Sequence, residues 1–156
     1  MSQRIQHIIE DITEQYLEND GNIPWIIGFS GGKDSAVVFT LVWRALLAIR
    51  ATLGNESLKR PVFVVNNDTL VENPIISDYI IEVLDCIKTA AVKQDLPITV
   101  QITTPKLEDS FWISFLGKGY PVPNNQFRWC TDRLKIKPTS QFILDKIDAM
   151  GEAIVL

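Results

Sequence analysis

The feature that most constrains the fold of this chain is a short apolar run that ends in glycines and leads straight into a long apolar stretch. The run covers residues 25–29, the connection is the hexapeptide SGGKDS at 30–35, and the stretch covers 36–53. The run predicts a strand buried on both faces, and the stretch predicts a buried helix. The order strand, tight loop, helix is typical of a parallel sheet covered by helices.

The rest of the chain repeats this alternation. Apolar runs predict strands at 61–66 and 98–103 and a last one at 153–156, and helical spacing predicts helices over 76–91 and 138–150. We therefore expect an α/β fold, a three-layer α/β/α arrangement with a mostly parallel sheet and right-handed crossovers. In such sheets ligands bind at the carboxyl ends of the strands.

Two further segments complete the predicted domain organisation. Residues 1–20 are expected to form an N-terminal leader helix that ends in turn residues at 19–22, and residues 21–156 form one α/β domain. The long aromatic stretch at 105–137 is expected to be a lid or a partner-contact segment, not a further part of the sheet. We expect the domain to be truncated, because the run at 153–156 stops where a functional loop would follow.

Composition narrows the function classes. The net charge of −4 argues against a broadly basic nucleic-acid surface, although a local basic patch is compatible with it. The two cysteines, Cys86 and Cys130, have no C-x-x-C spacing, which excludes a disulfide framework and favours a reducing cytoplasm. Arg44 interrupts the most apolar stretch, 36–49, so we expect no membrane span.

The SGGKDS loop has the residue types that hold phosphate. Backbone N–H groups and the positive end of the following helix converge there. Gly31 and Gly32 permit close approach and positive φ, Lys33 adds a cation, and the hydroxyls of Ser30 and Ser35 can donate. The alternative is a glycine-rich strand-to-helix turn that binds nothing.

Asp34 is the exception in this loop, because a carboxylate beside phosphates is repelled unless a cation lies between them. We expect it to bind Mg²⁺ or to order the loop. The loop is not a Walker site, since Gly28 and Gly32 enclose three residues instead of four and Asp34 follows Lys33. A G-x-G-x-x-G dinucleotide pattern is also absent.

Two acids follow the second predicted strand. Asp68 and Glu72 are expected on the rim that faces the loop, where they would hold Mg²⁺ or a ribose. The alternative role is helix capping or a solvated acid.

Cys130 is a candidate ligand or sulfur carrier. It lies in a cationic run that would stabilise a thiolate and attract phosphate or sulfate, namely Arg128, Arg133, Lys135 and Lys137. A small buried cysteine and a solvated helix entrance are the alternatives. The aromatic residues nearby either stack bases or, as is more common, pack a core or lid.

Three motifs together resemble a known superfamily. SGGKDS at 30–35 matches the S-G-G-x-D-S pattern of PP-loop ATP pyrophosphatases. NDTL at 67–70 and FRWCTDRLKIKP at 127–138 resemble the phosphoadenosine phosphosulfate reductase-like branch. DTLVENP at 68–74 and RWCT at 128–131 are most similar to DndC, the sulfurtransferase family of bacterial DNA phosphorothioation. The resemblance implies an adenine nucleotide alpha hydrolase-like PP-loop fold over 21–156.

The resemblance also implies ligands and residue roles. ATP would contact Ser30, Gly31, Gly32, Lys33, Asp34, Ser35, Asp68 and Arg128, with catalytic roles for Lys33, Asp34 and Cys130. Metal contacts would come from Asp34, Asp68 and Cys130. An iron–sulfur cluster in this family uses four cysteines, of which this chain offers only Cys130 in the matching segment, so the other ligands are expected beyond Leu156.

Three functions follow as hypotheses. The first is a sulfurtransferase that uses ATP and Mg²⁺ to activate a DNA backbone phosphate, with a cysteine desulfurase or another sulfur-transfer protein and sister modification subunits as partners. The second is a sulfonucleotide reductase, whose distal cysteine motif is missing here. The third is a truncated nucleotide-binding module without turnover.

Overall fold

The computed structural model describes residues 3–18 and 23–156. The predicted turn at 19–22 and the boundary between 20 and 21 lie outside these described residues. In chain order the elements are α1 (Gln3–Leu17), β1 (Trp25–Gly28), α2 (Lys33–Leu53), η2 (Asn55–Ser57), β2 (Val62–Asn67), α3 (Pro74–Lys93), β3 (Ile98–Thr103), η3 (Leu107–Asp109), η4 (Ile113–Gly117), α4 (Trp129–Thr131), η5 (Asp132–Ile136), α5 (Lys137–Met150) and β4 (Ile154–Val155). The elements η2 and η3 are 3₁₀ turns, and η4 and η5 are π turns.

The four strands form one parallel sheet in the order β3-β2-β1-β4. Ile27 pairs with Val64, and Val64 pairs with Val100, so the carboxyl ends of β1, β2 and β3 lie at one edge. This confirms the predicted α/β class and parallel sheet. The chain builds outward from β1 to β3 and then crosses back to place β4 on the other side of β1, a strand-order reversal that commonly marks a ligand site.

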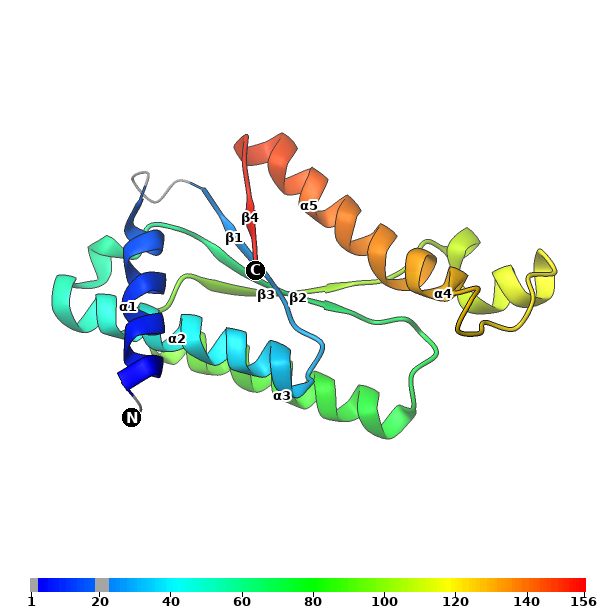
Figure 1. Cartoon of the computed structure of the whole chain (residues 1–156), viewed down its shortest axis with the longest axis horizontal. Coiled ribbons are helices and arrows are strands. Elements are labelled where there is room, and N and C mark those ends of the chain that lie inside the picture. Colours follow the sequence, from blue (N-terminus) through cyan, green and yellow to red (C-terminus); the bar gives the residue numbers. More distant parts are fainter. Residues whose placement is uncertain (1–2, 19–22) are drawn as a thin grey trace.

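Helices cover both faces of the sheet because successive strand residues point to opposite sides (Figure 1). On one face Ile27 and Val62 pack with α2, and Val64 packs with Leu84 and Ile87 of α3. On the other face a cluster of strand and α5 residues forms, namely Ile26, Phe63, Val65, Phe142 and Ile143. The central strand β1 and the first four residues of β2 are therefore apolar and mostly buried, as a sheet covered on both faces requires, whereas β2 ends in two asparagines and β3 also carries polar residues.

The helix α1 is fixed to the sheet by a buried arginine. The Arg60 side chain is fully buried, and its guanidinium donates to the carbonyl oxygens of Tyr16 (3.0 Å), Glu18 (2.5 Å) and Ile23 (3.0 Å). In return the Tyr16 hydroxyl donates to the Arg60 carbonyl at 2.6 Å. Burial lowers the pKa of Arg60 and raises the pKa of Tyr16 to about 12.

The helix α2 covers the predicted helix at 36–53, which includes the most apolar stretch 36–49, and starts slightly earlier. It begins at Lys33, directly after the loop, and with 21 residues it is long and apolar enough by length and composition to cross a membrane. A single helix of this kind does not by itself indicate a membrane span. Val42, Leu46 and Ile49 are buried in the core, and core helices of this kind pass the same test of length and composition.

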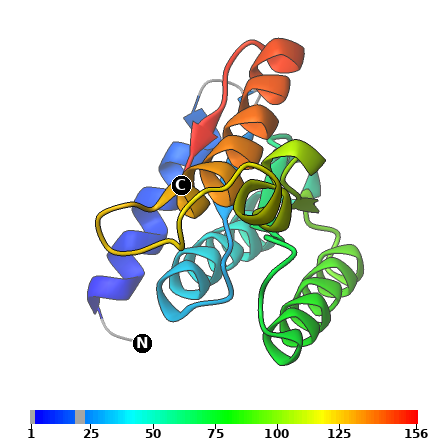
Figure 2. The same ribbon diagram turned by 90° about the vertical axis from the view of Figure 1, so that its right-hand side faces the viewer.

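The segment 105–137 forms helical turns and no strand over its described residues. Figure 2 views the molecule from the end that carries this segment. Aromatic side chains pack on one another there: Phe111 stacks on Trp129 with ring centroids 5.4 Å apart, and Tyr120 meets Trp129 edge-on at 5.4 Å. Trp129 is buried, and Phe111 and Tyr120 are half-buried around it, so these rings pack on one another within the segment.

Candidate functional site

The SGGKDS loop turns sharply between β1 and α2. Gly31 has a φ of 73°, a conformation that glycine adopts at little cost. A Cβ on Gly31 would lie 2.0 Å from Cδ1 of Ile80, so α3 lies directly against the loop. Gly32 caps α2 with no side-chain hydrogen bond, which leaves the N-terminus of that helix open to an anion.

The hydroxyls of the loop bond to one another and to the loop backbone. Ser30 Oγ and Ser35 Oγ are 3.1 Å apart, Ser35 Oγ donates to the Gly32 carbonyl at 3.0 Å, and the Gly32 amide donates to Ser30 Oγ at 3.4 Å. The side chains of Lys33 and Asp34, in contrast, are exposed and make no hydrogen bond or ion pair with the described part of the chain. The loop is held in shape by its serines, and its cation stays available.

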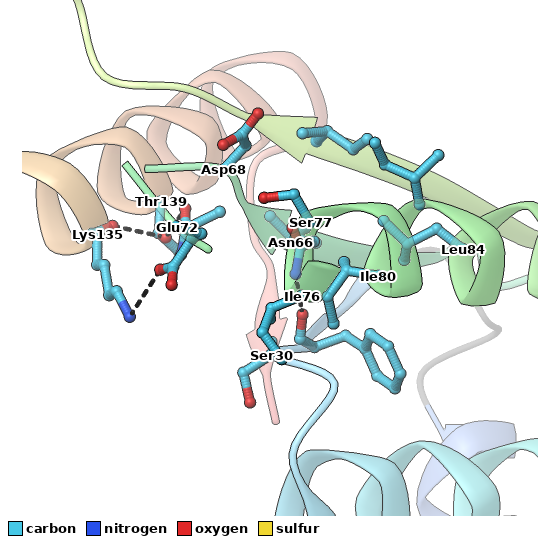
Figure 3. A pocket seen from close by; sticks show the side chains of 16 residues that line it. Ser30, Asn66, Asp68, Glu72, Ile76, Ser77, Ile80, Leu84, Lys135 and Thr139 are labelled. Atoms are coloured by element: carbon cyan, nitrogen blue, oxygen red, sulfur yellow. Dashed lines mark hydrogen bonds and ion pairs between the residues drawn. The ribbon is translucent and has the colours of Figure 1, made fainter. Parts of the chain in front are cut away.

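A cleft of about 380 Å³ opens at the carboxyl edge of the sheet (Figure 3). One wall is apolar and comes mainly from α3, and the rim is polar and comes from the strand ends, the β2–α3 loop and η5. The lining residues are Gly28, Phe29, Ser30, Val65, Asn66, Asn67, Asp68, Glu72, Ile76, Ser77, Ile80, Ile81, Leu84, Ile102, Lys135 and Thr139. The structure thus brings Ser30 and both predicted acids, Asp68 and Glu72, to one cleft.

Two asparagines that sequence reasoning missed stand at the end of β2. Asn66 is 7% exposed, and its Nδ2 donates to the Phe29 carbonyl at 2.7 Å. Asn67 Oδ1 accepts hydrogen bonds from Thr103 Oγ1 and, at 2.8 Å, from Thr139 Oγ1. The available signal was two adjacent amides that end an otherwise apolar strand, at the edge where ligands bind.

The two predicted acids are both engaged locally. Asp68 Oδ1 accepts from the Leu70 amide at 2.8 Å, and Leu70 has a φ of 63°, so this carboxylate stabilises a tight turn. Glu72 Oε1 accepts from Thr69 Oγ1 at 3.2 Å and lies 3.8 Å from Lys135 Nζ. Both acids line the cleft, and each has one oxygen with no partner in the described chain.

The cationic run at 128–137 is mostly neutralised. Arg133 and Lys137 both pair with Asp109, with Lys137 Nζ 3.5 Å from Asp109 Oδ2. Arg133 also donates to the Tyr120 hydroxyl at 2.6 Å. With Lys135 paired to Glu72, these side chains join separate segments instead of surrounding a cysteine.

Arg128 and Cys130 line neither of the two clefts. Arg128 is exposed, Cys130 is half-buried, and neither lines the cleft at the sheet edge. They are also absent from a second cleft, of about 560 Å³, which lies beside β3 and α5 and is lined in part by Asp109 and Lys137. Neither cleft therefore offers a ligand-binding surface next to Cys130.

The predicted metal ligands come from three different elements. Asp34 lies in the first turn of α2, Asp68 follows β2, and Cys130 lies in α4. Within residues 3–18 and 23–156, no group of three His, Cys, Asp or Glu side chains is placed to hold a metal ion. The two carboxylates are oxygen ligands that suit Mg²⁺. A four-cysteine cluster does not fit this chain by itself, which has two cysteines.

The comparisons with known proteins do not identify a family. No protein-family model matches this chain, and no curated protein matches it. The chemistry of the loop and the cleft therefore carries the functional inference.

Proposed function

We propose that the chain is a nucleotide-binding domain with the three-layer fold of PP-loop ATP pyrophosphatases. In this proposal it binds ATP with the triphosphate on the SGGKDS loop and the base in the adjoining cleft. The nucleotide activates a substrate for sulfur insertion by forming an adenylated intermediate and pyrophosphate. The acceptor that we propose is a DNA backbone phosphate, as the resemblance to the DndC family implies.

The observation that carries the proposal is the continuity between loop and cleft. Ser30 belongs to both, so a ligand with an anionic end and a flat apolar end would reach both at once. The loop supplies oriented backbone donors, the helix end and an unpaired Lys33, which would stabilise charge on a leaving pyrophosphate. The apolar α3 wall suits a nucleobase.

Mg²⁺ would be held jointly by the nucleotide phosphates and by nearby carboxylates. Asp34 is exposed in the first turn of α2, and Asp68 has one oxygen that accepts no hydrogen bond from the described residues. The ion would neutralise phosphate charge and so allow a carboxylate to lie beside the loop.

The test is pyrophosphate release from ATP with Mg²⁺, in the presence of DNA, a cysteine desulfurase and cysteine. We expect turnover by the unaltered chain and a loss of at least tenfold in Lys33→Ala and Asp34→Ala. Lys93→Ala, an exposed lysine at the end of α3, is the matched control and should retain turnover. Reduction of phosphoadenosine phosphosulfate with thioredoxin, without ATP or DNA, would point to the reductase instead.

A nucleotide-binding module without turnover is the second candidate. It is favoured by the location of Cys130 outside both clefts and by the paired state of Arg133, Lys135 and Lys137. Such a module would bind ATP with the same dependence on Lys33. It would release no pyrophosphate with any acceptor.

A further inference from the structure

We propose that Asn66 sets the base preference of the cleft by accepting a hydrogen bond from the 6-amino group of adenine. This inference rests on the proposed nucleotide-binding function and assigns a specificity role to a residue outside the SGGKDS loop. Three observations carry it: the fixed orientation of the amide, the accessibility of its oxygen, and the apolar surroundings.

The orientation of the Asn66 amide is determined by its neighbour. A backbone carbonyl can only accept a hydrogen bond, so the group that lies 2.7 Å from the Phe29 oxygen must be the amide nitrogen (Figure 3). A flipped amide would bring two acceptors together and lose that bond. Oδ1 is therefore fixed as the side-chain atom that is free to meet a ligand.

Asn66 lines the cleft, and its side-chain oxygen is available to a ligand. It accepts no hydrogen bond from the described chain, and the buried side-chain N and O atoms without a partner there are Trp25 Nε1 and Ser114 Oγ. Since Asn66 Oδ1 is unpartnered but does not belong to that buried set, it retains contact with solvent. Asn66 lines the cleft at the sheet edge and does not line the second cleft, so we place that solvent contact in the first.

The surroundings of Asn66 favour a flat heterocycle. Asn66 follows Val64 by two residues and so points to the same face of the sheet, toward α3. The side chains that line this part of the cleft are aliphatic, namely Ile76, Ile80, Ile81, Leu84 and Ile102. A directional acceptor beside apolar side chains discriminates between donors and acceptors on a bound base, because a mispaired polar group loses a hydrogen bond there.

Asn66 Oδ1 distinguishes the two classes of purine by whether position 6 donates or accepts a hydrogen bond. Adenine carries an amino group at position 6, which donates to an amide oxygen. Hypoxanthine and guanine carry an oxygen at position 6, which would place two acceptors against each other. The Ser77 hydroxyl, on the α3 wall of the cleft, can rotate to donate or accept and therefore does not discriminate between the two classes of purine.

The experiment compares the affinities of the full chain for ATP, inosine triphosphate and purine riboside triphosphate, which differ only around position 6. We expect the unaltered chain to bind ATP about tenfold more tightly than inosine triphosphate, with the unsubstituted purine between them. Asn66→Leu should bring ATP and inosine triphosphate to within about twofold of each other. Ser77→Ala, the matched control, should keep the tenfold preference.

Equal affinity of the unaltered chain for ATP and inosine triphosphate would overturn the role of Asn66 and leave the nucleotide site standing. A preference that persists in folded Asn66→Leu would overturn it as well. If that variant does not fold, the affinities of the unaltered chain for the three nucleotides still test the proposed preference for a 6-amino group. Binding of none of them would overturn both this inference and the proposed function.

Discussion

The two ends of the same parallel sheet differ in whether their polar side chains have hydrogen-bond partners within the described chain. At the amino end, Arg60 is fully buried, and its guanidinium donates to three carbonyl oxygens and lies over the rings of Tyr16 and Trp25. At the carboxyl end, Lys33, Asp34 and Asn66 Oδ1 have no partner in the described chain. The amino end is closed by protein, whereas the carboxyl end keeps several polar groups unpaired within the described chain.

The difference shows which polar groups of this sheet contribute to stability and which stay available to bind a ligand. A buried charge is tolerated only when hydrogen bonds replace its hydration, which is the arrangement around Arg60. The one exception at that end is Trp25 Nε1, which is buried without a partner in the described chain. Polar groups that remain open to a cleft keep their water until a ligand displaces it.

The largest expected effect is at the closed end. Arg60→Met leaves three backbone carbonyls without a donor, so we expect the free energy of unfolding to fall by about 3 kcal/mol or more. Urea unfolding measures this. Lys59→Met, an exposed neighbour, should change it by less than about 0.5 kcal/mol. Equal effects of the two substitutions would break the contrast between the two ends.

The second effect depends on pH. Tyr16 has a pKa of about 12 in the folded chain, against about 10 when unfolded, so the folded state favours the neutral phenol. Its contribution is complete below pH 10 and is lost as the pH rises toward 12, a loss of roughly 2–3 kcal/mol. Alkaline unfolding should show this slope, Tyr16→Phe should reduce it, and Tyr79→Phe should retain it. An unchanged slope in Tyr16→Phe would contradict the burial of that hydroxyl.

A smaller effect is expected in the loop. Gly31→Ala forces a side chain into positive φ and against Ile80, which should cost about 1–2 kcal/mol of stability and weaken ATP binding. Gly32→Ala, with φ of −78°, is the matched control and should cost less. Adding Ile80→Val removes Cδ1 and should relieve the steric part of the stability loss, while the part due to positive φ at residue 31 remains. No recovery in the double variant would mean that α3 does not press on the loop.

The smallest effect concerns the rim of the cleft. Lys135 and Glu72 are both about half exposed and 3.8 Å apart, so a double-mutant cycle with Lys135→Ala and Glu72→Ala should give a coupling below about 1 kcal/mol. A weak coupling would mean that this ion pair contributes little to holding the rim closed. A coupling above about 2 kcal/mol would show instead that the rim is locked.

The sequence was a good guide to the strands, the helices and the loop. Strands such as β1 and β2 are apolar because both faces are covered, and the glycines at 31–32 mark the turn between β1 and α2. These features depend on local patterning, and the structure confirms them. The ATP chemistry and the residues assigned to it stay predictions.

Other parts of the site depend on neighbours that are distant in sequence. Arg60 follows Lys59 and has the pattern of a solvated basic pair, yet α1 docks over it and buries it. Arg133 and Lys137 have the pattern of free cations, but Asp109 lies between them in the fold. The orientation of Asn66 follows from the position of the Phe29 carbonyl, which no local pattern gives.

The most direct test of the open carboxyl end is the affinity for ATP with Mg²⁺, measured by titration calorimetry on the unaltered chain, Lys33→Ala and Lys93→Ala. A charged group that bonds a phosphate is worth roughly 1.5–3 kcal/mol, so Lys33→Ala should weaken binding at least tenfold while Lys93→Ala stays within about twofold. No binding by the unaltered chain, or equal binding by all three, would contradict a nucleotide site at this end of the sheet.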